Sequence, residues 1–341
     1  MRTTRPREAA TDTAISAKAN PEVWFIGVDQ APCIDEAGAP DPTFTCAGDL
    51  ATLLPNFIGL QYAEDQAGYL AGIVAASLSE NANIGAIGGI NLVPAVVRYI
   101  QGYEMGAKSV NPDIVVNSAY VSTSDFGVAF NDPGAGKTFA EQFIDTNSPD
   151  VLFQVAGKTG NGVLEAACEA GIHGVGVDVD QWLSLAADTT PAYQCIVTSA
   201  EKKLASSVQQ TIEAIAGDTA TPGVNVFNAA NGGVGVSPEH GTDLITDDIQ
   251  ALLDAALATY RAELPPDSAF WPFCSKSCAV TPASMRRNTC LVCRDTSACR
   301  ARSPSTSIGT NSSFPSGPMA TRLSLRYDSG SVTYTGSALI G

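Results

Sequence analysis

One unit between Asp150 and Trp182 constrains the fold of this sequence most: it reads as strand, glycine turn, helix and strand. An apolar run leads into a turn at Gly157, apolar residues then recur at helical spacing, and a second apolar run ends at Asp178. In an open parallel sheet, ligands bind outside the carboxyl ends of the strands. The unit therefore predicts a ligand site at this edge of the sheet, where the turn at Gly157 lets a ligand approach the backbone closely and Asp178 supplies an acidic hydrogen-bond acceptor. This arrangement suits a polyhydroxyl ligand.

Strands and helices alternate in the same way along the first 264 residues. Strands are expected at 23–28, 56–62, 83–89, 115–121 and 193–199, and helices at 65–78, 93–109, 133–145, 202–216 and 246–264. The segment Val224–Val236 is expected to form a hairpin around Asn231 and the two glycines after it. No internal repeat is visible. The alternation predicts an α/β architecture with parallel sheets.

The pattern ends at Pro265 and Pro266. Ser, Thr and Pro make up 30 of the final 77 residues, and five cysteines lie between Cys274 and Cys299. Their spacing is irregular and no histidine accompanies them, so disulfides or an out-of-frame translation explain them at least as well as zinc does. Residues 265–341 are predicted to be an unassigned irregular tail, disordered or separately cross-linked, without a metal site.

The charge is distributed unevenly. Residues 1–264 hold 11 basic and 32 acidic side chains, a net of −21, whereas residues 265–341 hold 8 and 3, a net of +5. An acidic body argues against nucleic acid as a partner, because phosphate binding needs clustered cations. No apolar run approaches the ~20 residues of a membrane helix. The first residues have no apolar core, so they do not read as a signal peptide.

The body contains four cysteines. Cys33 and Cys46 flank a loop rich in Pro, Asp and Gly, and they could close it as a disulfide. Cys168 and Cys195 fall in helix and strand patterns, where buried free thiols are at least as expected as a bridge.

Eight segments occur in the order found in the basic membrane protein family, the purine-nucleoside-binding lipoproteins of ABC importers, which this sequence resembles from about Ala17 to Leu264. The segments are NFIGLQYAEDQAGYLAG (56–72), IGAIGG (84–89), RYIQGYEMGAK (98–108), FNDPGAGK (130–137), DVLFQVAGKTGNGV (150–163), GVGVDVDQ (174–181), TSAEKK (198–203) and NGGVGVS (231–237).

The resemblance implies a type I periplasmic-binding-protein fold, in which two lobes with parallel sheets close on a ligand at a hinge cleft. Residues 1–264 are then the solute-binding domain, with the first lobe at about 1–80 and 200–220 and the second at about 81–199 and 221–264. Family members begin earlier, with a lipoprotein signal and further strands, so about a hundred residues of the first lobe are expected to be missing. The tail has no counterpart in the family.

The resemblance also suggests ligand-binding residues, each with a structural alternative. Asp178 would bind the ribose hydroxyls, or would cap a helix. Lys202 would donate to a ribose oxygen or pair with Asp178, or would be a solvated lysine like Lys203. Phe130 would stack on the base, with Phe126 as its rival, or either would fill core. Asp29 would lie at the carboxyl edge of the first lobe. The turn from Gly157 to Gly160 would admit a ligand, or only a packed helix.

Enzyme and cofactor motifs are absent or incomplete. Asn131 replaces the first glycine that a phosphate-binding loop would need before Lys137, so Asp132 reads better as a helix cap. Only two histidines occur, His173 and His240, and neither lies beside a nucleophile motif. We therefore expect no cofactor, no metal and no catalysis, and a nucleoside hydrolase is disfavoured.

The resulting prediction is a solute-binding component of an ABC importer that binds a purine nucleoside and, in the full-length parent, a permease. The family resides at the cell surface or in the periplasm, attached to the membrane. This chain is expected to bind weakly if at all, because half of the base-contacting surface is predicted to be missing. The alternatives are a sensory or scaffolding domain derived from a solute-binding protein, or a non-functional fragment or fusion.

Overall fold

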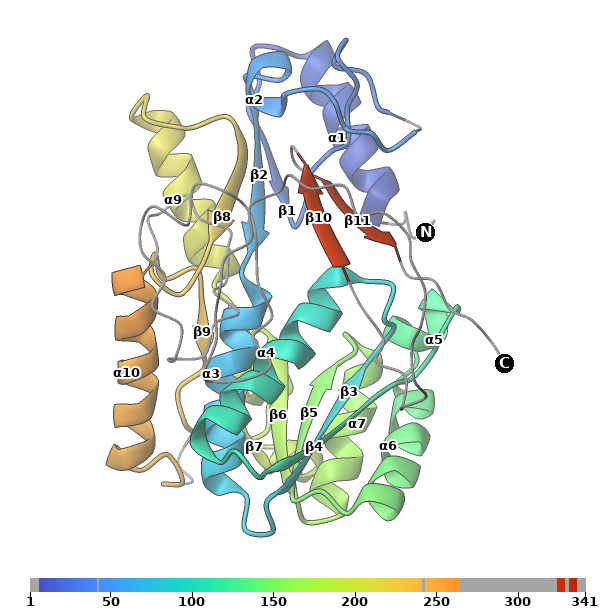
Figure 1. The fold of residues 1–341 in the computed structure, drawn as a ribbon, viewed down its shortest axis with the longest axis vertical. Coiled ribbons are helices and arrows are strands. Elements are labelled where there is room, and N and C mark those ends of the chain that lie inside the picture. The colour runs from blue at the N-terminus through green and yellow to red at the C-terminus, as the bar shows by residue number, and fades with distance from the viewer. Residues whose placement is uncertain (1–5, 42, 241–242, 264–323, 329–330, 336–341) are drawn as a thin grey trace, which may run out of the picture. The chain divides into compact units, whose positions relative to one another are not determined.

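The computed structural model describes residues 6–41, 43–240, 243–263, 324–328 and 331–335 (Figure 1). The elements up to residue 263 belong to one compact unit, and the antiparallel hairpin of β10 (Ser324–Asp328) and β11 (Ser331–Thr335) belongs to a second. The expectations for the rest of the tail, including its five cysteines, lie outside the described residues. Among the described helices, none is both long and apolar enough to cross a membrane.

The first sheet is small and parallel, with strand order β1-β2-β8. Its strands are β1 (Phe25–Val28), β2 (Phe57–Tyr62) and β8 (Gly223–Phe227), accompanied by helices α1 (Pro6–Ala19), α2 (Leu50–Leu53) and α9 (Leu204–Ala216). Ala14 and Ala17 of α1 pack with Leu54 and Phe57 into a buried cluster. Helix α1 was not predicted from the sequence, yet it closes one side of this lobe.

The second sheet has six strands in the order β4-β3-β5-β6-β7-β9, all parallel except β9. The strands are β3 (Asn83–Gly88), β4 (Val115–Tyr120), β5 (Val151–Val155), β6 (His173–Asp178), β7 (Ile196–Lys202) and β9 (Val234–Val236). The helices are α3 (Glu64–Leu78), α4 (Pro94–Val110), α5 (Phe126–Asn131), α6 (Pro133–Asn147), α7 (Thr159–Glu169), α8 (Gln181–Ser184) and α10 (Asp247–Glu263), with a 3-10 turn at Pro191–Tyr193. The parallel α/β architecture expected from the alternation is confirmed.

Helices cover both faces of the second sheet, which is why every residue of β5 is buried. On one face, Leu152 joins a core cluster with Phe143 of α6 and Val163 of α7. On the other, the ring of Phe153 lies 6.2 Å from that of Tyr99 and 4.9 Å from that of Tyr103, both on α4. Neighbouring residues of one strand thus anchor two separate helical layers.

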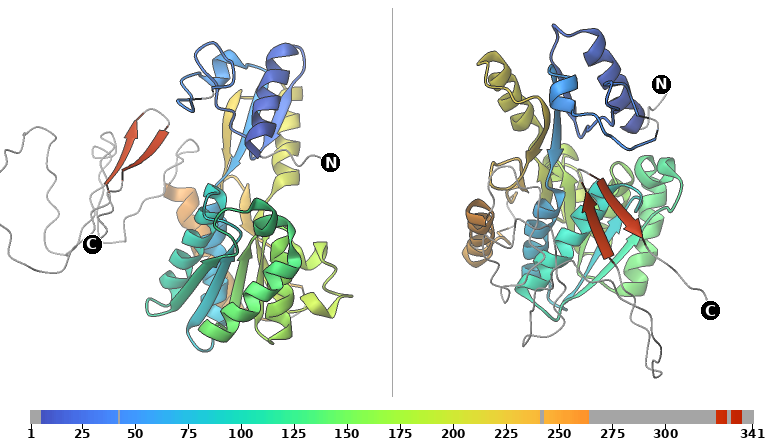
Figure 2. Two further views of the ribbon diagram at one scale, coloured as in Figure 1. Left: turned by 90° about the vertical axis from the view of Figure 1, so that its right-hand side faces the viewer. Right: turned by 45° about the horizontal axis from the view of Figure 1, so that its top comes forward.

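The chain crosses between the two sheets three times (Figures 1 and 2). It passes from β2 into α3 after Tyr62, from β7 into α9 after Lys202, and from β8 to β9 between Phe227 and Val234. Two lobes with parallel sheets are the arrangement expected from the resemblance, and the structure joins them by three crossovers. The first two crossovers lie where the strands end, so the residues beside them lie at the carboxyl edges of the sheets.

The segments that form each lobe differ from those expected, whose boundaries were near residues 80 and 220. Helix α3 packs against α4 and β7 of the second lobe, and β8 pairs with β2 of the first. The predicted hairpin over Val224–Val236 is wrong, because β9 pairs with β7 instead. The side chain of Asn231 accepts from the amide of Asn228, so the turn is real, but it joins two lobes rather than two paired strands.

Helices α3 and α4 meet backbone to backbone through four glycines. A Cβ on Gly68 or Gly72 would lie 2.1 Å from the carbonyl oxygen of Tyr99 or Tyr103, and a Cβ on Gly102 or Gly106 would lie 2.0 or 1.9 Å from that of Asp65 or Tyr69. Glycine at four-residue spacing on both helices lets the backbones approach this closely. The crossing therefore fixes the helices in one register.

Two disulfides lie in the described part of the chain. Cys33 is bonded to Cys46, which closes the loop after β1 as the sequence suggested. Cys168 is bonded to Cys195, so the open choice between free thiols and a bridge is resolved in favour of the bridge. It ties α7 to the residue before β7, on the sheet edge opposite to the one that carries Asp178.

Removing the second bridge is expected to cost about 3 kcal/mol of unfolding free energy, because the closed loop spans 27 residues. The variant is Cys168→Ala with Cys195→Ala, measured by urea unfolding without reductant. Cys33→Ala with Cys46→Ala, which opens a 13-residue loop, is the matched comparison and should lose slightly less. An unchanged midpoint in the first variant would contradict this expectation.

Candidate functional site

Two aspartates end strands of opposite lobes, and both have left-handed backbone conformations. Asp29 follows β1 with φ 54°, and Asp178 ends β6 with φ 65°. The amide of Val179 donates to the carbonyl of Val177 at 2.8 Å, so the chain turns tightly around Asp178. This conformation costs a non-glycine residue roughly 1–2 kcal/mol, although aspartate tolerates it better than most. Strained backbone at both strand ends marks a candidate site.

The Lys202 ammonium joins these two carboxylates. Lys202 is the last residue of β7, and its Nζ lies 2.9 Å from Oδ2 of Asp29 and 3.7 Å from Oδ1 of Asp178. The Lys202 side chain is only 5% exposed, whereas each aspartate side chain is 47% exposed. The three residues therefore form one cluster, with the cation inside and the acceptors toward solvent.

A third carboxylate completes the cluster, and sequence reasoning missed it. Oε1 of Glu64, in the first turn of α3, lies 3.2 Å from Nζ of Lys202, and its side chain is 2% exposed. Oε2 of the same residue accepts from Nε of Arg98 on α4 at 2.7 Å. Acidic residues at a helix start are ordinarily explained by the helix dipole, so Glu64 beside Asp65 gave no signal of its own.

Two tyrosines enclose the lysine. Nζ of Lys202 lies 5.6 Å from the ring centre of Tyr62 and 5.8 Å from that of Tyr99, within reach of a cation–π interaction. The Tyr99 hydroxyl donates to Oδ1 of Asp178 at 3.3 Å. Tyr99 is buried, so it orients the Asp178 carboxylate from the interior of the protein, while the Asp178 side chain stays half exposed to solvent.

The electrostatics keep the lysine charged. Burial alone would lower the pKa of Lys202, but the charges of Asp178, Glu64 and Asp29 outweigh burial and raise that pKa above its ordinary value. Burial raises the pKa of Asp29, and the charge of Lys202 offsets part of that rise. With Arg98 included, two cations face three carboxylates, so the ionised cluster carries a net charge of −1.

The alternatives for Asp178 and Lys202 do not hold in the structure. The N-cap of α8 is Asp180, whose side chain accepts from the amide of Leu183, so Asp178 is no helix cap. Lys202 is buried, whereas Lys203 is 36% exposed and pairs with Glu201. The predicted cap at Asp132 is confirmed, since it accepts from the amide of Ala135.

Phe130 and Gly157 form a second group at the end of β5, the strand next to β6. Phe130 belongs to α5, is half-buried, and accepts from the amide of Lys158 at 3.0 Å. Its ring centre lies 6.2 Å from that of Phe126, which is 45% exposed. Both aromatics are thus partly accessible. Their roles as ligand contacts remain predictions.

Gly157 has φ 54°, and a Cβ there would meet its nearest atom, the carbonyl oxygen of Phe130, at an ordinary 3.5 Å. Gly157→Ala is therefore expected to destabilise the chain through backbone strain alone, by about 1 kcal/mol. Urea unfolding measures the change. A stabilised variant, the result expected for Gly→Ala where the backbone is relaxed, would show that the turn carries no strain.

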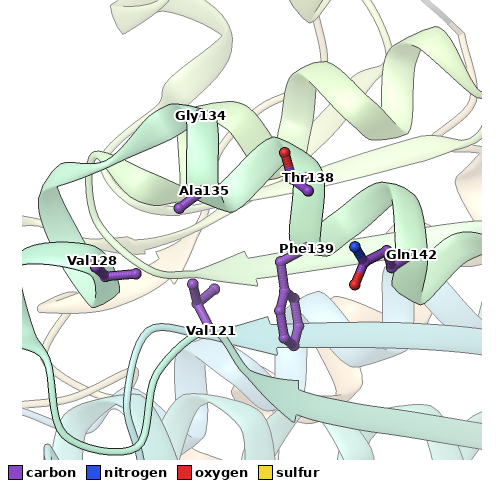
Figure 3. A pocket seen from close by; sticks show the side chains of 7 residues that line it. All are labelled: Val121, Val128, Gly134, Ala135, Thr138, Phe139 and Gln142. Carbon is purple, nitrogen blue, oxygen red and sulfur yellow. The ribbon is translucent and has the colours of Figure 1, made fainter.

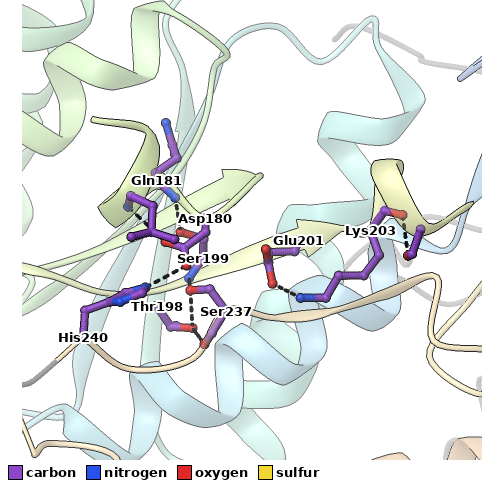
Figure 4. A network of polar contacts seen from close by, with 10 residues as sticks. Asp180, Gln181, Thr198, Ser199, Glu201, Lys203, Ser237 and His240 are labelled. Atoms are coloured by element: carbon purple, nitrogen blue, oxygen red, sulfur yellow. Dashed lines mark hydrogen bonds and ion pairs between the residues drawn. The ribbon is translucent and has the colours of Figure 1, made fainter. Parts of the chain in front are cut away.

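A separate polar network lies behind α8 (Figure 4). Nε2 of His240 lies 2.7 Å from Oδ2 of Asp180. The centre of the His240 ring lies 4.5 Å from that of Trp182, and the two rings are stacked. The Ser199 hydroxyl accepts from the amide of Gln181, and the Ser237 hydroxyl accepts from the amide of Ser199. These contacts pin α8 to β7 and β9, and so support the segment that begins at Asp178.

An open pocket lies beside α5 and α6, and none of the predicted site residues lines it (Figure 3). Its lining is apolar or uncharged: Val121, Val128, Gly134, Ala135, Thr138, Phe139 and Gln142. No titratable side chain lines this pocket, whereas charged side chains gather around Lys202.

Comparison with known proteins gives a consistent result. Residues 16–264 match the family model described as ABC transporter substrate-binding protein PnrA-like. The ABC transporter nucleoside-binding protein BmpA of Lactococcus lactis subsp. cremoris is 29% identical over 248 residues, which cover 70% of this chain and 63% of that protein. Basic membrane protein D of Borreliella burgdorferi is 35% identical over 128 residues, 37% and 35% of the two chains. The chain thus spans less than two thirds of these curated relatives.

Solved structures agree on the fold. The solute-binding protein of an ABC transporter system from Conexibacter woesei superposes with a TM-score of 0.56 at 25% identity, over 76% of this chain and 77% of that one. The corresponding protein from Aeropyrum pernix gives a TM-score of 0.55 at 20% identity, over 75% and 72%. The chain therefore has the two-lobed α/β fold of solute-binding proteins.

Proposed function

The chain belongs to the PnrA-like family of ABC transporter substrate-binding proteins, and we propose that it binds a purine nucleoside between its two lobes and carries out no chemistry on it. In the full-length protein, the partner that accepts the loaded domain would be the permease of an ABC importer. The relative from Lactococcus lactis is named a nucleoside-binding protein, which supports this class of ligand.

The observation that carries the proposal is a pair of half-exposed aspartates, Asp29 and Asp178, that lie on opposite lobes and both contact Lys202. Asp29 is 173 residues from Lys202 in the sequence, and Asp178 is 24 residues from it. A carboxylate accepts hydroxyl hydrogen bonds, and charge-assisted bonds are the stronger kind. A ribose offers neighbouring hydroxyls, so Asp29 and Asp178 can each accept from the sugar. Lys202 can donate to a sugar oxygen between them.

The base would lie toward α5. Phe130 and Phe126 offer partly accessible rings there, and stacking of a base on an aromatic side chain is worth roughly 1–3 kcal/mol in nucleic-acid complexes. The left-handed turn at Gly157 leaves backbone without a Cβ beside Phe130. Closure of the two lobes about the crossovers would then bury the ligand, a motion known for binding proteins of this architecture.

The cysteines support the compartment that we propose. Disulfides persist in oxidising environments and are rare in the cytosol. Both described disulfides, one in each lobe, favour a location at the cell surface or in the periplasm. Membrane attachment is proposed from the family alone.

Isothermal titration calorimetry tests the ligand class. Guanosine, inosine and adenosine are expected to bind the chain, whereas free ribose and amino acids are not. Asp178→Ala should weaken nucleoside binding by more than about 1.5 kcal/mol, the scale of a hydrogen bond to a charged group, and leave the fold intact. Tight binding of a sugar or an amino acid in place of nucleosides would contradict the proposal.

A further inference from the structure

Glu64 differs from the other acids around Lys202 in its burial and in the completeness of its contacts. Its side chain is 2% exposed, and each carboxylate oxygen already has a cationic partner: Lys202 at 3.2 Å and Arg98 at 2.7 Å. A ligand approaching from solvent has no free oxygen of Glu64 to engage. Glu64 therefore faces the protein and not the ligand.

The two aspartates are in the opposite situation. Asp29 and Asp178 are about half exposed, and they are the acceptors that a hydroxyl-bearing ligand would use. When a ligand takes up their lone pairs, their hold on Lys202 weakens. A lysine whose side chain is 5% exposed still needs an anion at hydrogen-bond distance, because an uncompensated buried charge is costly. Among the carboxylates described around Lys202, Glu64 alone can supply that anion without contacting the ligand.

The helix crossing keeps Glu64 at this distance. Glu64 begins α3 and Arg98 lies on α4, and the two helices are interlocked through Gly68 and Gly102. Because those contacts join backbone to backbone, neither helix can slide without a clash. The Glu64 carboxylate is thus held by the scaffold on both of its oxygens.

We propose that Glu64 is a positioning residue of the ligand site, the permanent counterion that keeps the Lys202 ammonium in place when a ligand engages Asp29 and Asp178. The inference rests on the proposed function, since it concerns the same site. It assigns a division of roles: the aspartates exchange their partners on binding, and Glu64 does not.

The test compares Glu64→Gln, which removes the charge and keeps the shape, with Glu64→Asp, which keeps the charge and withdraws it by one methylene. Glu64→Gln is expected to weaken guanosine or inosine binding about tenfold or more in calorimetry, and Glu64→Asp by less. Unchanged affinity in Glu64→Gln, or an equal loss in both variants, would overturn the proposal. If Glu64→Gln does not fold, Glu64→Asp decides: weaker binding supports the proposal and wild-type binding refutes it.

Glu104→Gln is the matched control, because it removes the same charge from an exposed ion pair with Lys108 on α4. It should bind nucleosides like the wild type. An equal loss of affinity in this control would mean that overall charge, and not the position of Lys202, sets the affinity.

A titration of Lys202 by NMR on the ligand-free chain gives a readout that does not depend on nucleoside binding. The groups facing its Nζ are Asp29 after β1, Tyr62 of β2, Glu64 of α3, Tyr99 of α4 and Asp178 of β6. Removing one of the three anions should lower the pKa of Lys202 in Glu64→Gln, and an unchanged pKa would refute the proposal. If the wild type binds no nucleoside, the proposed function fails, and this titration still decides whether Glu64 holds the lysine.

Discussion

Lys202→Met is expected to lose about 3 kcal/mol of unfolding free energy and all measurable nucleoside binding, because it leaves a buried carboxylate short of a partner. Glu64 would keep only Arg98, and Asp29 would face Asp178 with no cation between them. Urea unfolding measures the first effect and calorimetry the second. Met fills nearly the same volume, so the loss reports the missing charge and not a cavity.

The pH dependence of this loss has a defined sign. The Lys202 cation favours the ionised carboxylates in the folded state, so its removal makes the folded variant bind protons more readily. Burial already raises the pKa of Asp29, and the loss of Lys202 would raise it further, so the stability gap between variant and wild type should begin to shrink above the ordinary carboxyl pKa of about 4 as pH falls. At the alkaline end, the raised pKa of Lys202 means that its contribution is complete below about pH 10.4 and is lost as pH rises further.

Lys203→Met is the control for Lys202→Met. Lys203 is the next residue, 36% exposed, and pairs only with Glu201 among the ion pairs described for it. Its loss is expected to cost less than the loss of Lys202, because Lys203 is partly exposed and gives up one described carboxylate partner, Glu201, whose side chain is 11% exposed. If Lys202→Met unfolds no earlier than Lys203→Met, the buried cluster does not stabilise the fold.

Gly106→Ala is the second change with a large expected effect. Its Cβ would lie 1.9 Å from the carbonyl oxygen of Tyr69 on the facing helix, and backbone cannot move aside as a side chain can. We expect a loss of about 3 kcal/mol or more, at the upper end of the cost of overpacking. Because α3 also carries Glu64, the displaced helix should weaken nucleoside binding as well.

Gly134→Ala is the matched control for the glycine crossing. Gly134 is also helical, but its Cβ would find its nearest atom 3.5 Å away, at Oδ1 of Asp132. This variant should be at least as stable as the wild type, with a gain of up to about 1 kcal/mol, because alanine favours a relaxed helical backbone. An equal loss of unfolding free energy in both variants would mean that replacing any helical glycine by alanine destabilises the chain, and that the helix contact is not the cause.

The sequence predicted the features that depend on residues close together in the chain. Alternating apolar runs were enough for the parallel α/β fold, because each strand and helix has its own period. The resemblance, and not a local pattern, suggested that Lys202 pairs with Asp178, and the structure brings the two together. The resemblance added Asp29, which no local pattern could relate to a lysine far along the chain. Whether these residues contact a ligand remains a prediction.

What the sequence did not reveal depends on contacts between distant elements. Glu64 looked like an ordinary acid at a helix start, and its pairing with Arg98 follows only from the glycine crossing. The turn at Asn231 has the composition of a hairpin, yet its flanking strands join different sheets. Turn chemistry reports the local bend alone, and the partner of each strand is chosen by the whole fold.

The strands of the first sheet come from distant parts of the chain, and this has a consequence for synthesis on the ribosome. Strand β2 emerges early, but β8, which covers its second edge, begins only at Gly223. At about 5–20 residues per second, the intervening stretch takes roughly 8–30 seconds to make. During that time the second lobe can assemble strands β3 to β7, while the apolar edge of β2 waits for a partner. The first sheet is therefore expected to stay incomplete until β8 has been made.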